Sequence, residues 1–327
     1  MAVAILSPVH CPEVVMLTRL LSCSLLALLL LQPAHAAPQE KRPFKVCWSI
    51  YAGWMLWGYM AEQGIVDKWA KKYGIEIQVE QVPDYVASIE QYTAGQYDAC
   101  AMTNMDALTI PAAAGTDSTA LIVGDYSNGN DGLLIKGEGK TLADLKGMQV
   151  NLVELSVSHY LLARALDSVG LSERDVRVVN TADADIVSAF ASPDVTATVT
   201  WNPQLSEVRK ADGATMVFDS SKIPGEIIDL MVVNTETLKD NPSLGKALVG
   251  AWYETLALMR DAGPKGTEAL TAMATAAGTD LEGYKAQLAT TKMFYTPAEA
   301  VAFASSPELV KGMDLVRTFS FDHGLLG

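Results

Sequence analysis

The fold is decided by residues 148–170, MQVNLVELSVSHYLLARALDSVG, where a strand pattern runs through a short polar loop into a helix pattern. A strand that leads into a helix is the repeating unit of parallel α/β folds, in which ligands bind beyond the carboxyl ends of the strands. Glu154 lies in this loop, at the expected mouth of the helix, where the helix end attracts anions. An acid there favours a ligand that is not an anion. The apolar face of the helix is expected to contain Leu161, Leu162, Ala165, Leu166 and Val169.

Strand and helix patterns alternate from Lys45 onwards. Strands are predicted at 44–50, 75–82, 98–102, 119–124, 132–136, 148–153, 175–180, 195–200 and 230–234. From Pro242 onwards the strands are expected to stop, and helices are predicted at 242–262, 265–277, 279–289, 296–305 and 307–322. Alternation followed by helices predicts an α/β fold with a helical C-terminal region.

Two clusters of turn-forming residues divide this pattern, SNGNDG at 127–132 and IPGE at 223–226. We therefore predict one lobe from residues 37–128 and 231–327, and a second lobe from residues 133–228. Two crossings between lobes would form a hinge, with a cleft between the halves.

Residues 1–36 predict an upstream extension and an export signal. Residues from Met16 provide a basic start, an apolar run from Leu20 to Leu31, and the sequence Ala34-His35-Ala36, which fits a cleavage site. The apolar run is too short to span a bilayer as a helix. We expect cleavage near Ala36 and a periplasmic protein, with Met1 and Met16 as alternative starts.

Composition excludes several classes of function. The formal net charge of −14 argues against nucleic acid or anionic lipid as a partner. Cys47 and Cys100 are the cysteines left after cleavage, and each lies in a strand pattern. They are either two separate buried thiols or, if the strands are neighbours in an oxidising compartment, a disulfide. No Cys/His spacing matches a zinc site, so we expect neither a metal nor a cofactor.

Several motifs, in their order and spacing, resemble the periplasmic substrate-binding proteins of the nitrate/sulfonate/taurine class of ABC importers. They cover about residues 45–260 and are KVCWSIYAGWMLWGYMAEQGIVDKW, TNMDALTIPAAAG, GLLIK, TLADLKGMQVNLVELSVSHYLLARALDSVGL, DVTATVTWNPQLSEV and PGEIIDLMVV. More narrowly, the chain resembles the branch associated with urea carboxylase, whose substrate is urea or guanidine. The resemblance implies a type II-like, two-lobe periplasmic binding protein fold that closes over one small molecule. It also implies a monomer without enzymatic activity that delivers its ligand to a permease and ATPase complex.

The resemblance also implies which residues bind the ligand, in loops that follow the strands. Relatives that bind sulfonate or nitrate are expected to present basic side chains or bare helix amides. Here the basic residues between Phe44 and Lys136 lie outside the expected crevice loops, which hold acids such as Asp125 and Asp131 and aromatic residues instead. A planar cation such as guanidinium fits this mixture, because carboxylates accept its N–H groups and aromatic faces attract its charge. The residues carried over are Tyr51, Trp54, Asn104, Asp106, Glu154, Ser158, His159, Tyr160, Trp201, Glu226 and Asp229.

Each of these residues also has a structural interpretation. Glu154 and Asp106 could stabilise the starts of helices. Glu226 could be a solvated turn acid, and Trp54 could pack in the core. Asp229 is flanked by apolar residues and so needs a partner if buried, either a ligand or a hinge amide.

The identity of the ligand also has alternatives. Asn104 or Ser158 could donate to the oxygen of urea, and backbone amides could bind an anion without leaving a sequence signature. A pyrimidine thiamine precursor is a further possible ligand. A desulfinase-like enzyme would need a cysteine in the cleft, whereas Cys47 and Cys100 fall inside strand patterns.

Overall fold

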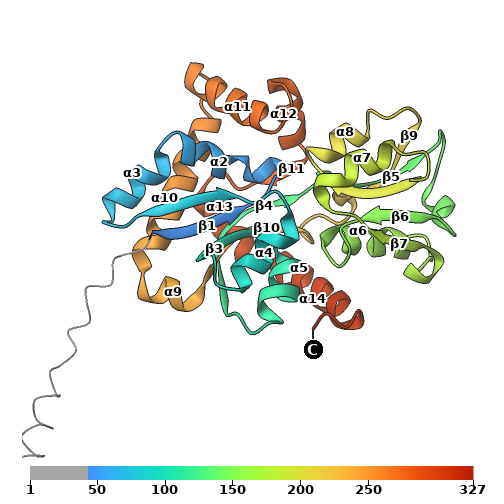
Figure 1. The fold of residues 1–327 in the computed structure, drawn as a ribbon, viewed down its shortest axis with the longest axis horizontal. Helices are drawn as coiled ribbons and strands as arrows, with labels where there is room; N and C mark the ends of the chain where they lie inside the picture. Colours follow the sequence, from blue (N-terminus) through green and yellow to red (C-terminus); the bar gives the residue numbers. More distant parts are fainter. Residues whose placement is uncertain (1–42, 327) are drawn as a thin grey trace, which may run out of the picture. The chain divides into compact units, whose positions relative to one another are not determined.

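The structure is a computed structural model that describes residues 43–326. The predicted export signal and its cleavage site lie outside the described residues. Strands and helices alternate along the chain and form two separate sheets, each with its own helices (Figure 1).

The first sheet has six strands in the order β11-β4-β10-β3-β1-β2. Neighbouring strands are parallel from β3 to β2, whereas β10 and β11 run antiparallel to their neighbours. We call this sheet and the helices around it lobe 1. Its strands are β1 (Phe44–Trp48), β2 (Ile77–Gln81), β3 (Ala99–Thr103), β4 (Ser118–Ser127), β10 (Ile228–Asn234) and β11 (Thr291–Met293). Its helices are α2 (Met55–Glu62), α3 (Ile65–Lys72), α4 (Tyr85–Thr93), α5 (Asn104–Ala107), α9 (Thr235–Asp240), α10 (Pro242–Met259), α11 (Pro264–Ala276), α12 (Leu281–Leu288) and α13 (Pro297–Ala304).

The second sheet has five strands in the order β7-β6-β8-β5-β9. We call this sheet and its helices lobe 2. The chain enters lobe 2 through residues 128–130 and returns to lobe 1 through residues 220–227. The strands are β5 (Asp131–Lys136), β6 (Gln149–Leu152), β7 (Arg177–Asn180), β8 (Ala197–Trp201) and β9 (Ala214–Asp219), and the helices are α6 (Val157–Asp167), α7 (Ile186–Ala191) and α8 (Gln204–Val208).

The segment from β6 to α6 is a strand, a turn and a helix, as its sequence predicts, but Val169 lies beyond the end of α6 and is exposed. The side chain of Ser156 accepts a hydrogen bond from the backbone N–H of Ser158 and thereby caps the start of α6. Leu155 has a left-handed φ of 62°, which turns the chain from the strand into the helix. The apolar face of α6 is buried, and each large aliphatic side chain removed from water contributes about 1.5–3 kcal/mol. This face includes Leu161, Leu162, Ala165 and Leu166.

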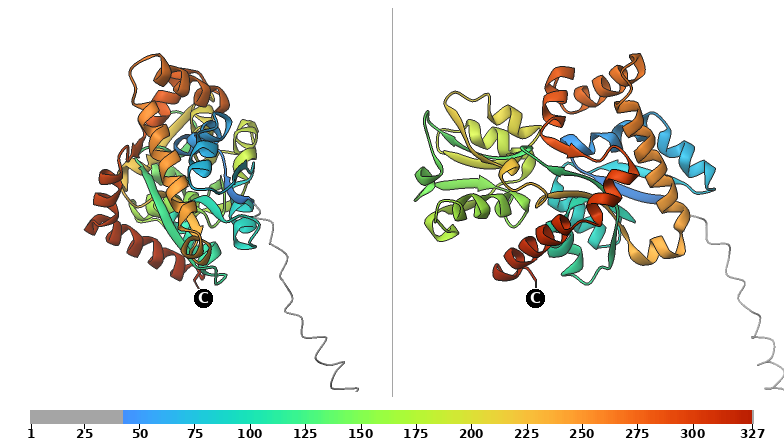
Figure 2. Two further views of the ribbon diagram at one scale, coloured as in Figure 1. Left: turned by 90° about the vertical axis from the view of Figure 1, so that its left-hand side faces the viewer. Right: turned by 180° about the vertical axis from the view of Figure 1, so that it is seen from behind.

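The C-terminal helix α14 (Pro307–Asp322) packs against both lobes (Figure 2). It contacts α5 of lobe 1, and its Val316 and Phe319 belong to the apolar core of lobe 2. Gly312 lies so close to the return segment that a Cβ there would be 2.6 Å from the carbonyl oxygen of Gly225. The helix α14 therefore packs against both the return segment, residues 220–227, and lobe 2.

The structure confirms the α/β class and the helical C-terminal region. Two expectations about strands are wrong. Strands do not stop at Pro242, because β11 pairs with the edge of β4, and β9 was not predicted. The predicted domain division, with one lobe from residues 37–128 and 231–327 and a second from residues 133–228, stays a prediction. No helix among residues 43–326 has the length and apolar character needed to cross a membrane.

Cys47 and Cys100 lie opposite each other on the neighbouring strands β1 and β3. Both are buried and both thiols are free. Burial raises the pKa of the Cys47 thiol far above its usual range, so the thiol stays protonated. Within the structure they act as small apolar side chains of the lobe 1 core.

Candidate functional site

A small cavity lies where lobe 1 and lobe 2 meet, at the carboxyl ends of several strands. Tyr51 follows β1, Tyr85 begins α4 after β2, and Trp201 ends β8. The cavity offers about 20 Å³ to the centre of a water-sized sphere, which limits an occupant to a few heavy atoms. Its wall is formed by Tyr51, Trp54, Tyr85, Thr103, Asp131, Val157, Trp201, Ile227 and Asp229.

Aromatic rings form a continuous part of this wall. The ring centres of Tyr51 and Trp54 are 5.1 Å apart, those of Trp54 and Tyr85 are 5.8 Å apart, and those of Tyr85 and Trp201 are 5.6 Å apart. Trp201 comes from lobe 2, and its indole N–H donates to the carbonyl of Ile50 in lobe 1 over 3.2 Å. The aromatic wall therefore includes rings from both lobes.

Buried carboxyl groups form the polar part of the site. Asp131, at the start of β5, and Asp229, in β10, line the cavity from lobe 2 and lobe 1, and each is only 3% exposed. Asp125 is fully buried and lies opposite Asp229 in the register of β4 and β10. Asp106 is 1% exposed and lies behind the wall, where it accepts a hydrogen bond from Tyr85 over 2.5 Å. The site is acidic, and no Lys, Arg or His is among the described residues that line it.

Burial keeps these acids partly protonated near neutral pH. Desolvation raises the pKa of Asp131 to about 7, although a hydrogen bond from Ser127 opposes the shift. Desolvation also raises the pKa of Asp106 to about 6. Burial raises the pKa values of Asp125 and Asp229 as well, and the charge of Asp125 raises that of Asp229 further. A bound cation would stabilise the ionised forms of all these acids.

Most side-chain donors of the wall are already used by protein acceptors. Tyr51 donates to Asp125 over 2.9 Å, and both Tyr85 and Thr103 donate to Asp106, over 2.5 Å and 2.8 Å. The indole N–H of Trp201 donates to a backbone carbonyl, whereas the indole N–H of Trp54 has no acceptor among the described residues. Oδ2 of Asp229 likewise has no hydrogen-bond donor among the described residues. The wall therefore has a free carboxylate acceptor and one side-chain donor, the indole of Trp54, without a protein partner.

Four of the predicted site residues meet at this cavity: Tyr51, Trp54, Trp201 and Asp229. Asp106 stands behind the wall, where it supports the two hydroxyl groups that donate to it. Asn104 is buried and has a structural role, because its side chain donates to the carbonyl of Glu226 and accepts from the backbone N–H of Ile228.

The other predicted residues lie away from the cavity wall. Glu154 is exposed, because the cap of α6 is Ser156 and the loop turns Glu154 outwards. Ser158 is buried but does not line the cavity. His159 pairs with Glu173, and its Nδ1 accepts from the backbone N–H of Leu155 over 3.1 Å.

Glu226 forms a salt bridge rather than a ligand contact. It accepts two hydrogen bonds from Arg164, over 2.9 Å and 3.1 Å, and one from the hydroxyl of Tyr160. Tyr160 and Arg164 come from α6, so this salt bridge joins the return segment to lobe 2.

Sequence reasoning missed Tyr85, Thr103, Val157 and Ile227. Tyr85 carried a usable signal, because it follows a strand and the N-cap Asp84 in the sequence VPDYV. No feature of the sequence pointed to Thr103, Val157 or Ile227, because residues of these types are common at the ends of strands and helices. Asp125 and Asp131 were recognised as acids of crevice loops, and the structure places both at the site.

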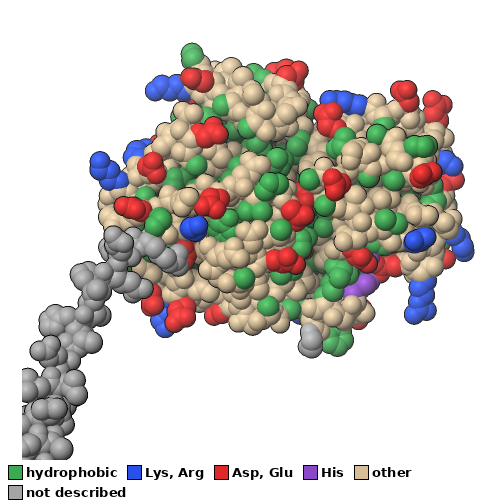
Figure 3. Space-filling model, in the orientation of Figure 1, with side chains coloured by type: hydrophobic (Ala, Val, Ile, Leu, Met, Phe, Trp, Pro, Cys, Tyr) green, Lys and Arg blue, Asp and Glu red, His purple; other side chains and the backbone are tan. Residues whose placement is uncertain are grey.

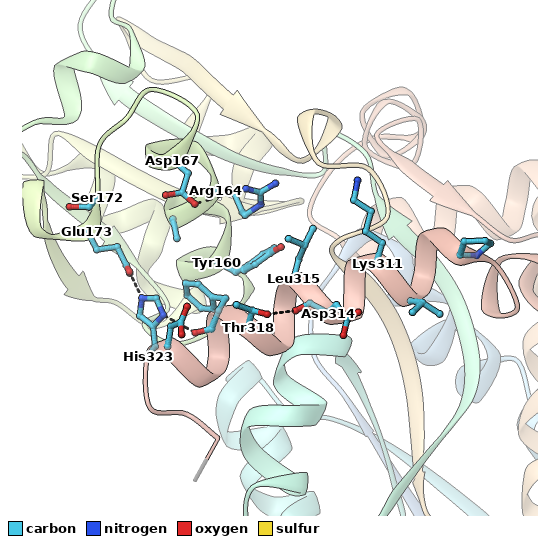
Figure 4. A pocket seen from close by; sticks show the side chains of 15 residues that line it. Tyr160, Arg164, Asp167, Ser172, Glu173, Lys311, Asp314, Leu315, Thr318 and His323 are labelled. Carbon is cyan, nitrogen blue, oxygen red and sulfur yellow. Dashed lines mark hydrogen bonds and ion pairs between the residues drawn. The ribbon is translucent and has the colours of Figure 1, made fainter.

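A larger hollow of about 650 Å³ lies between α6 and α14 (Figure 4). Several of its charged side chains have ion-pair partners. Glu173 contacts both His323 and His159, and Arg164 binds Glu226. In the surface view, acidic side chains are distributed over the face that is drawn, without a broad basic patch (Figure 3). Neither feature has the buried, unpaired polar atoms of the small cavity.

The sequence profile of the NMT1/THI5-like family matches residues 59–262, which is more than half of the chain. The chain belongs to the NMT1/THI5-like family. A protein of Brucella abortus named as a binding protein is 26% identical over 226 residues, covering 68% of each chain. An aliphatic sulfonates-binding protein of Escherichia coli is 36% identical over 84 residues, covering 26% of each chain.

Solved structures show the same fold. The alkanesulfonate-binding protein of Xanthomonas axonopodis pv. citri, bound to MOPS, matches 87% of this chain and 94% of its own with a TM-score of 0.71 and 17% identity. The periplasmic nitrate-binding protein of Synechocystis PCC 6803 matches 88% and 91% with a TM-score of 0.61 and 12% identity. The expected periplasmic binding protein fold is confirmed.

Proposed function

We propose that this NMT1/THI5-like protein is the solute-binding protein of an ABC importer and that it holds a small planar cation of the guanidinium class in the cavity between its lobes. It would work in the periplasm as a monomer, deliver the cation to a permease and ATPase complex, and catalyse no reaction. The named relatives and the fold support the first part of this proposal. The cavity supports the choice of ligand.

One observation carries the choice of a cation. The cavity has several acidic acceptors, including the free Oδ2 of Asp229, whereas all of its side-chain donors except the indole of Trp54 are occupied. A guanidinium ion has only N–H donors, and it binds carboxylates in a forked geometry. Because all its polar groups are donors, it matches a wall that offers acceptors.

Each lobe contributes one acid to the wall of the cavity. Asp131 belongs to β5 of lobe 2 and Asp229 to β10 of lobe 1. A cation between them would attract both carboxylates and so favour the closed arrangement of the lobes. A permease could then distinguish the loaded protein from the empty one by its closure.

The contacts available in the cavity supply a gross binding free energy of the same order as micromolar affinity requires. Each hydrogen bond between the cation and a carboxylate contributes about 1.5–3 kcal/mol, and each aromatic face about 0.5–2 kcal/mol. Two acids and two rings therefore supply about 4–10 kcal/mol before the costs of ordering. Micromolar affinity corresponds to about 8 kcal/mol.

An anion is the second candidate, because relatives are named for sulfonate and nitrate. The start of α6 is the feature that favours it, since Val157 lines the cavity at the positive end of this helix. Urea fits the size of the cavity, but its oxygen would need a donor. A pyrimidine thiamine precursor could stack on the rings, and it needs more room than a few heavy atoms.

Calorimetric titration of the purified protein with guanidinium, urea, taurine, nitrate and a pyrimidine tests the proposal. We expect micromolar binding of guanidinium chloride, at concentrations far too low to denature the protein, and weaker binding of the others. Tighter binding of taurine or nitrate than of guanidinium would contradict the cation proposal while leaving the role in import intact. Consumption of any bound compound would contradict the proposal that the protein is not an enzyme.

A further inference from the structure

We propose that Asp125 and Asp229 share one proton in the ligand-free protein, and that cation binding drives this proton into solvent. The inference rests on the proposed binding of a cation at this site. It adds an exchange of charge, in which the net charge of the pair changes by one as the ligand enters. Binding would then depend on pH in a way that a fixed anionic site does not.

The geometry of the two strands brings these carboxyl groups together. Asp125 and Asp229 are directly opposite in the antiparallel pairing of β4 and β10, so their side chains project from the same face of the sheet. They are close enough for each to shift the pKa of the other. Two ionised carboxylates have no proton with which to form a hydrogen bond to each other, whereas a pair with one proton does.

The surroundings of the pair favour a single shared proton. Asp125 is fully buried and Asp229 is 3% exposed, so two charges here would be costly. Oδ2 of each residue lacks a donor among the described residues, and the hydroxyl of Tyr51 is the donor to Oδ1 of Asp125. The shared proton supplies the missing donor. It also lowers the charge of an otherwise purely acidic group.

The other titratable groups around the pair bring no positive charge. They are Tyr51 from the loop after β1, Asp131 from β5, Tyr284 from α12 and Tyr295 after β11. Asp106 of α5 acts on Asp131 from behind the wall. Without a cation, these acids therefore repel one another and hold protons. A bound cation provides the positive charge that replaces one of these protons.

The exchange balances in atoms and charge. The cation enters with one positive charge, the O–H bond of the shared proton breaks, and the proton passes to a buffer base in solution. The carboxylate that is freed accepts an N–H group of the ligand. No electron transfer and no covalent bond to the ligand are involved.

Linkage fixes the direction of the pH dependence. The ligand prefers the ionised pair, so its presence lowers the pKa of the pair. Affinity is then full above the ligand-free pKa and is lost as the pH falls below it, by up to about tenfold per pH unit for one proton. Neutral urea lacks the charge that expels the proton, so any binding of urea should depend much less on pH.

Calorimetry with guanidinium chloride in buffers of different ionisation enthalpy measures the proton directly. At about pH 6.5, we expect the observed binding enthalpy to vary with the buffer and to give a release of about 0.5–1 proton per ligand. Binding without any release would overturn the inference and leave the proposed function standing. Absence of guanidinium binding would overturn the proposed function itself, and the inference with it.

Asp125→Asn identifies the source of the proton. Asp125 is not on the cavity wall, so the variant keeps Asp229 for the ligand and gives it an amide donor in place of the shared proton. We expect guanidinium binding to release clearly fewer protons than in the wild-type protein, because only the contribution of Asp131 remains. Undiminished release would assign the proton to Asp131 and overturn the pairing. Asp185→Asn is the matched control, because Asp185 is exposed and its side chain does not cap α7.

If Asp125→Asn does not fold, Asp131→Asn decides the question, because it removes the other acid that could release a proton. Its dissociation constant for guanidinium should still fall as the pH rises, and it should level off only above the ligand-free pKa of the pair. A dissociation constant that is constant between about pH 5.5 and 8 would overturn the inference.

Discussion

Replacement of Asp131 by asparagine should weaken guanidinium binding strongly. The side chain is 3% exposed and lines a cavity of about 20 Å³, so water has little room to replace a lost contact. A hydrogen bond to a charged partner contributes about 1.5–3 kcal/mol, which corresponds to about 10–150-fold in affinity. The introduced amide would also direct N–H donors at a ligand that has only donors. The loss should therefore lie in the upper half of this range.

Titration followed by tryptophan fluorescence is a suitable assay, because Trp54 and Trp201 line the cavity. The fold should survive the change, since an asparagine oxygen still accepts the hydrogen bond from Ser127. Asp185→Asn serves as the control for the removal of one negative charge. A loss of less than about threefold for Asp131→Asn, with an unchanged melting temperature, would refute a direct contact between Asp131 and the cation.

Three further predictions concern features outside the cavity wall. Glu154→Gln should change guanidinium affinity by less than about twofold in the same titration, because the side chain is exposed. A larger loss of affinity would show that Glu154 contributes to the binding site. Burial lowers the pKa of His323, but hydrogen bonds to Glu173 and to the carbonyl of Phe319 outweigh this and raise it. His323→Asn should therefore lower the melting temperature by about 2–4 °C below pH 6.5, and the loss should fade as the pH rises through the folded-state pKa. An equal loss at every pH would contradict an ionic role. Gly312→Ala should destabilise the fold by about 1–3 kcal/mol in thermal unfolding, since its Cβ would meet the Gly225 carbonyl; an unchanged melting temperature would show that α14 can shift freely.

The sequence predicted the fold well wherever an element had a clear period. The apolar face of α6 and the helices after Pro242 could be located because several turns repeat the same pattern. The strand β11 could not be located, because three residues show no period and the strand exists only through its pairing with β4. The edge strand β9 was missed because most of its residues are partly buried, so its apolar and polar side chains alternate only weakly.

The acidic and aromatic character of the cavity could be predicted more easily than the residues that line it. Acids and aromatic rings at strand ends indicated a cation, and Tyr51, Trp54, Trp201 and Asp229 do meet at one cavity. Glu154 was misplaced because Ser156, two residues later, caps α6 and the left-handed turn at Leu155 directs the loop outwards. Which of two nearby polar residues caps a helix depends on packing, and that packing cannot be read from the sequence.

The most direct test of the account is a crystal structure of the protein with guanidinium chloride at a concentration near the dissociation constant. The account predicts a planar group inside the cavity, between the aromatic rings, with its N–H groups directed at Asp131 and Asp229. An empty cavity, or an anion bound at the start of α6 beside Val157, would contradict it.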